Sequence, residues 1–173
     1  MSLIVEPIRG YYENGNIKSE IYKLNDKYHR EDGPAFIEYY ENGNIKRQEY
    51  YENDCRHRED GPANISYYKN GNIEYKRYFI NNKLHREDGP ALIDYYKNNN
   101  ITYECYCVKG KIHKKDGPAQ INYYIDGGIQ SKEYYINGEK HREDDPAEVF
   151  YYENGNVEYE EYCINDKIHR ENG

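Results

Sequence analysis

The sequence predicts an all-β protein: an elongated single-layer antiparallel sheet of tandem β-hairpin repeats. Three observations predict this fold. A Tyr-Tyr pair and a histidine each recur every 28 residues, turn-forming pairs occur twice in each repeat, and apolar residues alternate with polar ones between the turns. A fixed period of this kind is the sign of a repeat array in which each unit adds one supersecondary element.

The repeat is marked by residues that keep a constant phase, among them all six histidines and five of the six prolines. We expect one repeat array over residues 1–173, with six units in register from about residue 11. Residues 1–10 form an atypical capping unit, in which Pro7 is one residue out of phase. The Tyr pairs begin at Tyr11, Tyr39, Tyr67, Tyr95, Tyr123 and Tyr151.

The first turn of each unit is an Asn-Gly pair, or a close variant, that follows the Tyr pair. This dipeptide between strand-like runs is the strongest short hairpin signal, because both residues accept positive φ. A two-residue loop would place Ile45 beside Tyr40, whereas a three-residue loop with a G1 bulge would place it beside Tyr39. We expect the bulge, because it gathers Ala35, Ile37 and Tyr39 with Ile45 on one face.

The second turn follows about eleven residues later, at pairs such as Asn53-Asp54 and Asn137-Gly138. The strand that rises from it is interrupted by E-D-G-P, whose proline has no N–H to donate to a ladder. We interpret this segment as a bend within a long strand. One unit has Asp145 in place of the glycine, so we expect negative φ there and a glycine that serves close approach of another group.

The composition excludes several classes of function. The chain has 24 Tyr but three Phe, one Met and no Trp, so its apolar contacts must come mostly from Tyr rings. The net charge is -8 and the two signs are interleaved. An acidic chain without a basic stripe is a poor binder of nucleic acid and does not dock on anionic lipid by charge alone.

The expected location is the cytoplasm, or a virion if the array is viral. The opening residues MSLIVEPIRG lack the features of a signal peptide, so we expect no secretory signal, and the sequence has no apolar run long enough for a spanning helix. The cysteines do not recur with the repeat, and free thiols in a reducing compartment are the simplest interpretation. Cys105 and Cys107 alternate on one strand and should point the same way. The four cysteines are Cys55, Cys105, Cys107 and Cys163.

One column of tyrosines on the descending strand is the candidate binding surface. A single sheet leaves one face partly open, and exposed Tyr-rich surfaces favour protein contact. Cross-strand packing is the alternative role of the same rings. The candidate residues are Tyr22, Tyr50, Tyr78, Tyr106, Tyr134 and Tyr162.

The histidine column is interpreted as structural. Histidine and carboxylates ligate metals, but two strand spacings per unit place equivalent residues about 10 Å apart, too far to share one zinc ion. We expect Arg-to-carboxylate contacts between units instead. Six copies of the same carboxylates do not make the single constellation that catalysis needs, so we expect no metal, no cofactor and no enzyme. The column is His29, His57, His85, His113, His141 and His169.

The run Y-Y-E-N-G-N-I-K, followed by a second turn and K-x-H, resembles the MORN repeat variant, a family that includes YwqK-like bacterial proteins described as antitoxins. The H-R-E-D-G-P-A form is similar to arrays of giant DNA viruses and AT-rich bacteria. The resemblance covers residues 11–173 and departs from the plain unit in its enlarged bend. It implies an elongated sheet of hairpins with roles in protein contact, dimerisation and sometimes phospholipid binding, and no shared catalytic site.

We therefore expect a non-catalytic scaffold that mediates protein–protein contact or self-association. One alternative is a groove that binds a peptide, a phospholipid headgroup or a sugar through a Tyr-lined face. Another is an antitoxin-like binding protein. The expected partner is a protein or a second copy of the chain, without nucleic acid or an integral membrane span, and peripheral lipid contact is left open.

Overall fold

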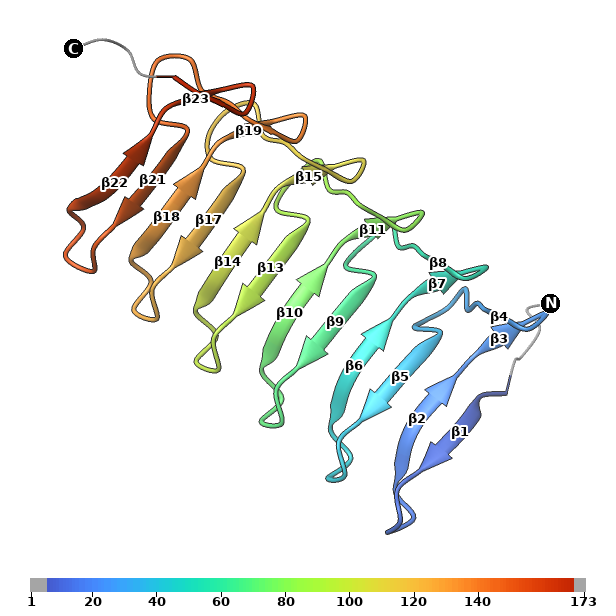
Figure 1. Ribbon diagram of the computed structural model, residues 1–173. Coiled ribbons are helices and arrows are strands. Elements are labelled where there is room, and N and C mark those ends of the chain that lie inside the picture. Colours follow the sequence, from blue (N-terminus) through green and yellow to red (C-terminus); the bar gives the residue numbers. More distant parts are fainter. Residues whose placement is uncertain (1–5, 170–173) are drawn as a thin grey trace. The chain divides into compact units, whose positions relative to one another are not determined.

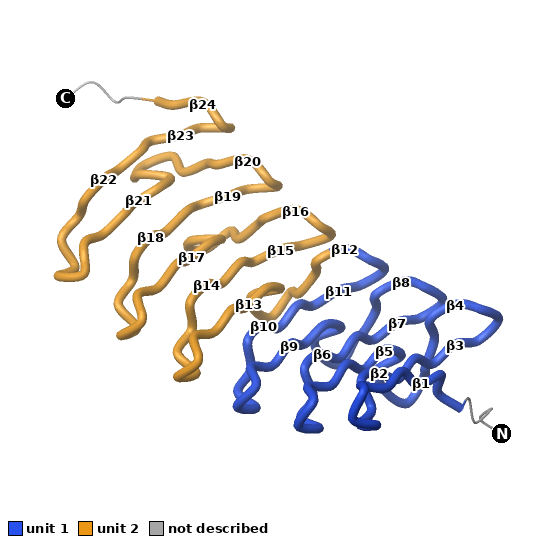
Figure 2. The backbone as a smooth tube through the Cα atoms, turned by 60° about the horizontal axis from the view of Figure 1, so that its bottom comes forward, with its two compact units in different colours: residues 1–83 blue, residues 84–173 orange. Residues whose placement is uncertain are grey.

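The computed structural model describes residues 6–169, and all regular structure in that range is β-strand (Figure 1). Its contacts divide the chain into two compact units, residues 1–83 and 84–173 (Figure 2). The apolar part of the predicted capping unit, residues 3–5, lies outside the described residues, as do residues 170–173.

The first unit contains one antiparallel sheet whose main strands pair in chain order. After the second strand of each main hairpin, the chain forms a small hairpin of two short strands, each of two residues. The main strands are β1 (Ile8–Tyr11), β2 (Ile17–Ile21), β5 (Phe36–Tyr39), β6 (Ile45–Glu49), β9 (Asn64–Tyr67) and β10 (Ile73–Arg77). The short strands are β3 (Lys23–Leu24), β4 (Lys27–Tyr28), β7 (Tyr51–Glu52), β8 (Cys55–Arg56) and β11 (Phe79–Ile80), and β12 (Lys83–Leu84) contains the boundary with the second unit.

The second unit repeats the same plan, so the prediction of an all-β antiparallel sheet of tandem hairpins is confirmed. Its main strands are β13 (Leu92–Tyr95), β14 (Ile101–Cys105), β17 (Gln120–Tyr123), β18 (Ile129–Glu133), β21 (Glu148–Tyr151) and β22 (Val157–Glu161). Its short strands are β15 (Cys107–Val108), β16 (Lys111–Ile112), β19 (Tyr135–Ile136), β20 (Glu139–Lys140), β23 (Cys163–Ile164) and β24 (Lys167–Ile168).

The first turn is the three-residue loop with a bulge, as predicted. The Gly43 N–H donates to the Tyr40 carbonyl (2.9 Å), and Gly43 has a φ of 86°, the left-handed conformation that the G1 bulge requires. Ile45 pairs with Tyr39, and a register shift follows between Glu38 and Tyr39. The Ile column therefore lies opposite the first Tyr of each pair.

The second turn is a tight two-residue loop in which both residues have positive φ, 50° at Asn53 and 66° at Asp54. This is the type I′ geometry, whose twist matches the strands that it joins. Its N–H groups bind the preceding repeat, because the Asp54 N–H donates to the Tyr28 carbonyl (2.9 Å). Neighbouring short hairpins are thus joined through their turns as well as through the main strands.

The E-D-G-P segment is a bend within one long strand, as predicted. Tyr50 marks the interruption, because its N–H donates to the Ala63 carbonyl (2.7 Å) and its carbonyl accepts the His57 N–H (3.2 Å). Arg58 still donates its N–H to the Phe79 carbonyl (3.1 Å), and residues 59–62 form the bend between those two bonds. The rising strand then resumes at β9.

Candidate interaction surface

One face of each hairpin carries the repeated apolar residues and is called the consensus face. Its alanines have no exposed surface, and its most buried aliphatic residues are between 5% and 8% exposed. Removing this apolar surface from water is the main favourable contribution to stability in so thin a structure. The buried residues are Ala35, Ile37, Ala63, Ile65, Ala91, Ile93, Ala119, Ala147 and Val149.

In the pairs that begin at Tyr39, Tyr67 and Tyr123, the first Tyr completes this face through its hydroxyl. Tyr39 donates to a Glu20 carboxylate oxygen (2.7 Å), and Tyr67 donates to the Gln48 side-chain carbonyl (3.0 Å). Burial, followed by the bond to Glu20, raises the pKa of Tyr39 to about 12. The polar ends of these rings are therefore paired within the sheet.

The predicted binding tyrosines lie beneath the cations of their own repeats. The Arg58 guanidinium carbon lies 4.1 Å from the centroid of the Tyr50 ring, within the range of a cation–π contact. Tyr78 and Tyr162 are half-buried in the same column, and a binding role for all six rings stays a prediction. The corresponding distances are 4.0 Å for Arg30–Tyr22, 3.7 Å for the Lys114 Nζ over Tyr106, and 4.0 Å for Arg142–Tyr134.

The glycine of the bend makes room for this arginine. A Cβ at Gly61 would lie 3.0 Å from the Arg58 guanidinium carbon, and Gly33 and Gly89 have the same relation to their arginines, so the predicted close approach is confirmed there. The prediction of negative φ is wrong at Gly117, which has a φ of 117°. Its unit has Lys114 instead of arginine, and a Cβ at Gly117 would lie 3.7 Å from the end of this side chain, so the glycine is not needed there for close approach.

The expected Arg-to-carboxylate contacts of the bend occur within single loops and not between units, and they are made by Arg30, Arg58, Arg86 and Arg142. The Arg58 Nε donates to Asp60 (2.7 Å), two residues along the same loop, and this pairing lowers the pKa of Asp60. In the unit with Asp145, Arg142 donates to that carboxylate instead. The expectation of contacts between units is wrong because the arginine folds back over its own tyrosine.

The histidines join neighbouring repeats. The His29 Nδ1 accepts the Asn53 backbone N–H (3.3 Å), and the His113 Nδ1 accepts that of Asn137 (3.1 Å). In each case the donor belongs to the tight second turn of the following repeat. The imidazole Nδ1 is thereby occupied by a backbone N–H, and a structural role for the whole column stays a prediction.

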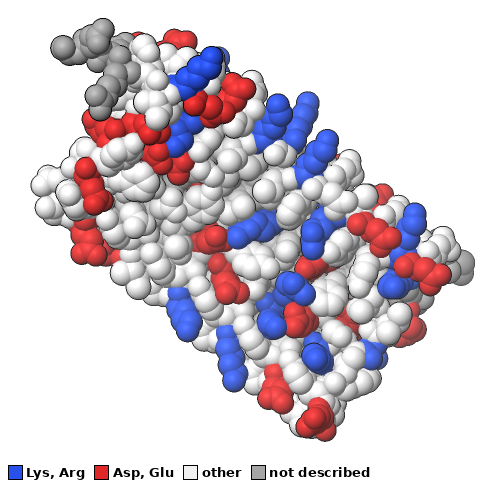
Figure 3. Space-filling model, viewed as in Figure 1, with Lys and Arg blue, Asp and Glu red and all other residues white. Residues whose placement is uncertain are grey.

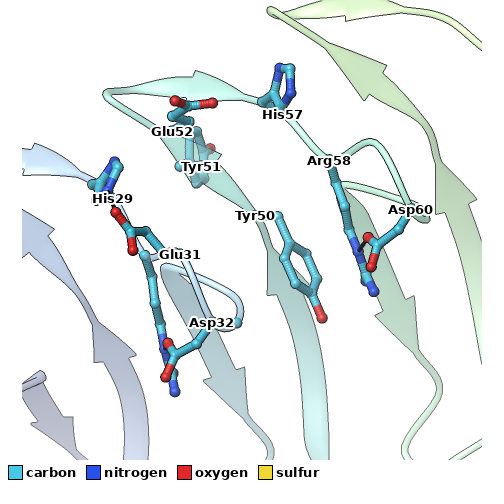
Figure 4. Close-up of a pocket in the computed structure, with 11 residues that line it drawn as sticks. His29, Glu31, Asp32, Tyr50, Tyr51, Glu52, His57, Arg58 and Asp60 are labelled. Carbon is cyan, nitrogen blue, oxygen red and sulfur yellow. Dashed lines mark hydrogen bonds and ion pairs between the residues drawn. The ribbon is translucent and has the colours of Figure 1, made fainter. Parts of the chain in front are cut away.

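A polar groove lies between successive loops on the consensus side (Figure 4). In the first unit it has a volume of about 510 Å³, and Tyr50 lies between the loops that contain His29 and His57. A groove of about 570 Å³ repeats the arrangement in the second unit. The arginines of the first groove are already paired with Asp32 and Asp60. The groove therefore offers outward carboxylates more than free cations.

The opposite face, called the variable face, changes in every repeat. Its residues alternate with the consensus residues along the same strands, and no two of the five hairpins that follow β1 and β2 have the same four residues. The sets are Phe36, Glu38, Arg47 and Glu49; Asn64, Ser66, Tyr75 and Arg77; Leu92, Asp94, Tyr103 and Cys105; Gln120, Asn122, Ser131 and Glu133; and Glu148, Phe150, Tyr159 and Glu161.

The chemistry of the variable face differs along the chain (Figure 3). In the first unit opposite charges alternate, and Arg47 contacts both Glu38 (3.4 Å) and Glu49 (3.3 Å). In the middle of the second unit most of the side chains are uncharged, with Asp94 and Glu133 as the exceptions, and the Gln120 amide donates to the Tyr103 hydroxyl (2.6 Å). This face therefore carries a different surface at each hairpin.

Acidic residues surround one lysine near the last hairpin of the second unit. The Lys140 Nζ lies 2.5 Å from Glu148, 3.7 Å from Glu133 and 3.9 Å from Glu161. Burial opposes the charge of this lysine, yet the carboxylates together raise the pKa of Lys140. Three carboxylates around one ammonium group leave this part of the variable face acidic.

The sequence predictions did not include this face, because they were drawn from the Tyr and His positions that recur in every repeat. The signal was available in the positions that do not repeat, which alternate with the consensus residues along each strand. The thiols of Cys105 and Cys107 also lie on the variable face and point the same way, as predicted.

Four segments match the MORN repeat variant family: residues 8–22, 35–53, 64–81 and 147–165. Each covers one main hairpin, so the chain is similar to this family at four of its repeats. A comparison with curated proteins finds no match. Within residues 6–169, no helix has the length and apolar character that crossing a bilayer requires.

Proposed function

We propose that the chain is a non-catalytic repeat scaffold that binds a protein partner through its variable face. The observation that carries the proposal is the contrast between the two faces. Contacts between neighbouring repeats restrict the residues on which packing depends and leave the others free to differ. MORN repeats are generally scaffolds for protein or membrane contacts, and four segments of this chain match them.

The composition of the variable face suits a protein partner. Protein interfaces are enriched in aromatic residues and arginine and are about as polar as the remaining surface. The face presents Phe36, Tyr75, Phe150 and Tyr159 among polar and paired charged side chains, and Tyr159 is 47% exposed. A rigid sheet that presents rings of this kind orders few side chains on binding, which limits the entropic cost of association.

The Tyr-lined groove has less support as a site for a sugar, a peptide or a headgroup. A ligand that stacks on Tyr50 would have to displace the Arg58 guanidinium from the ring. A phosphate would compete with the carboxylates that already pair with the arginines of the groove. Binding to a toxin, as an antitoxin does, would be one case of the proposed protein contact.

Photo-crosslinking in the cells that produce the protein tests the proposal. A benzophenone amino acid is placed at Tyr75 or Tyr159 on the variable face, and at the exposed turn residue Ile125 as the matched control. We expect an adduct with one other protein from the variable positions and none from Ile125. A further variant carries the benzophenone at Tyr50 in the groove. Equal adducts from all positions, or an adduct only from position 50, would contradict the proposal. An adduct of twice the chain mass would replace the foreign partner by a second copy.

A further inference from the structure

Two thiols converge on the variable face of the second unit. Cys105 ends β14 and Cys107 begins β15, so they are alternate residues of one extended run. Their Sγ atoms lie 3.5 Å apart, and each cysteine is only 3% exposed. Tyr106 between them donates its N–H to the Ala119 carbonyl (2.8 Å), which keeps the run extended.

The surroundings of the pair supply hydrogen-bond donors but no further metal ligand. The Gln120 amide nitrogen lies 3.7 Å from the Cys105 Sγ and donates to the Tyr103 hydroxyl. Among residues 6–169, no group of three or more His, Cys, Asp or Glu side chains could hold a metal ion together. The available donor set is therefore two sulfur atoms.

We propose that Cys105 and Cys107 bind one Cu(I) ion between their two thiolates. Soft thiolates select soft cations, among which Cu(I) and zinc are the common choices, whereas carboxylates and carbonyls suit hard ions. Zinc in structural sites almost always takes four ligands, and this pair would leave two of its positions unfilled. A monovalent soft cation matches a buried set of two sulfurs.

A disulfide fits the same pair less well. Residues two apart on a strand have Cα atoms about 6.6 Å apart, near the upper end of the disulfide range of roughly 4.4–6.8 Å. The sulfurs would also have to close from 3.5 Å to about 2.05 Å. A cation with metal–sulfur bonds of about 2.3 Å, as in zinc sites, spans the pair with only side-chain rotation.

Neighbouring hydrogen-bond donors stabilise the negative charge of the bound pair, although the Glu133 carboxylate opposes it. Binding requires both thiols in the thiolate form, so two protons leave as one Cu(I) enters. The bound group then carries one net negative charge. The Tyr103 hydroxyl and the Gln120 amide lie where they can donate to Cys105, which lowers the cost of burying that charge.

The chain contains a natural half-site that serves as a control. Cys163 occupies the repeat position of Cys107 two units later, but Glu161 stands at the position of Cys105. The Cys163 Sγ lies 3.3 Å from a Glu161 carboxylate oxygen. Glu161→Cys would therefore create a second pair in the same local frame.

The experiment is an anaerobic titration of the reduced full-length chain with Cu(I), in competition with bicinchoninate. We expect the wild type to withhold one Cu(I) per chain. Cys105→Ser and Cys107→Ser should each lose more than the roughly 10- to 100-fold of affinity that removal of an outer-shell partner costs, because they remove a ligand itself. Cys163→Ser and Cys55→Ser should bind like the wild type, and Glu161→Cys should withhold two.

Two results would overturn the site. One is a Cys105→Ser chain with an unchanged β-sheet circular dichroism spectrum that still binds Cu(I) as tightly as the wild type. The other is a folded Glu161→Cys chain whose capacity stays at one. Zinc held as tightly as Cu(I) by the wild type would contradict the choice of cation.

Discussion

Ile65 and Asn64 are neighbours on β9, yet they lie on opposite faces of the sheet and follow different rules. Ile65 is 8% exposed, and its counterparts Ile37 and Ile93 have the same residue type and exposure. Asn64 is replaced by Phe36 and Leu92 at the same position of the adjacent repeats. Because side chains alternate along a strand, one run of residues can serve packing on one face and recognition on the other.

The two faces differ in the contacts that their polar and charged side chains make. On the consensus face a guanidinium covers a tyrosine ring, a glycine admits that guanidinium, and a tyrosine hydroxyl meets a carboxylate or an amide. These contacts recur from repeat to repeat. On the variable face a given contact occurs in one hairpin and does not recur in the others, as with the ion pair between Arg47 and Glu49.

The largest expected effect comes from truncating the consensus face. Ile65→Ala should lower the free energy of unfolding by about 2–4 kcal/mol, through lost burial and the cavity left behind. Asn64→Ala, one residue away on the variable face, should lower it by less than Ile65→Ala does, because Asn64 is only half-buried and its side-chain oxygen has no hydrogen-bond partner to lose. Urea denaturation of both variants measures the two values. Equal losses would erase the distinction between the faces.

A smaller effect is expected from the cation over the tyrosine. Arg58→Ala should cost about 1–2 kcal/mol, because it removes the cation–π contact with Tyr50 as well as the packing of the arginine stem. Arg58→Lys should retain most of the stability, since Lys114 occupies the same position over Tyr106 at 3.7 Å. Thermal unfolding of the pair compares them. If lysine proved as costly as alanine, the ring contact would not be the source of the stabilisation.

The smallest expected effect is on the response to alkaline pH. The folded chain raises the pKa of Tyr39 to about 12 from the ordinary value of 10.0. This tyrosine therefore contributes stability fully below pH 10, and the contribution is lost as the pH rises toward 12. Tyr39→Phe should flatten the fall of unfolding free energy in that window, measured by urea titrations at successive pH values.

Tyr51 offers the matched test outside the consensus column. It donates to Glu49, and burial followed by that bond raises the pKa of Tyr51 to about 12 as well. Tyr51→Phe should flatten the same window to a similar degree, and the double variant should flatten it further. Profiles of both single variants that coincide with the wild type would show that neither hydroxyl resists ionisation in the fold.

The sequence by itself determined the repeat, both turns, the bulge that sets Ile45 beside Tyr39, and the bend at E-D-G-P. These are local properties: a period of two along strands, residues that accept positive φ, and a proline that cannot join a ladder. The close approach at Gly61 was also predictable, because Asp145 showed that the position does not demand positive φ. The sequence did not predict that the group approaching Gly61 is the Arg58 guanidinium.

Only the tertiary structure decided which groups meet across the repeats. The His29 Nδ1 binds the N–H of Asn53, 24 residues away, because stacking brings the next turn against the ring. The arginine turns back over its own tyrosine and not toward the next unit, since the loop path leaves that ring open to it. Alternation predicted that Cys105 and Cys107 share a side, but their 3.5 Å approach and near-complete burial depend on neighbouring strands that no local rule places.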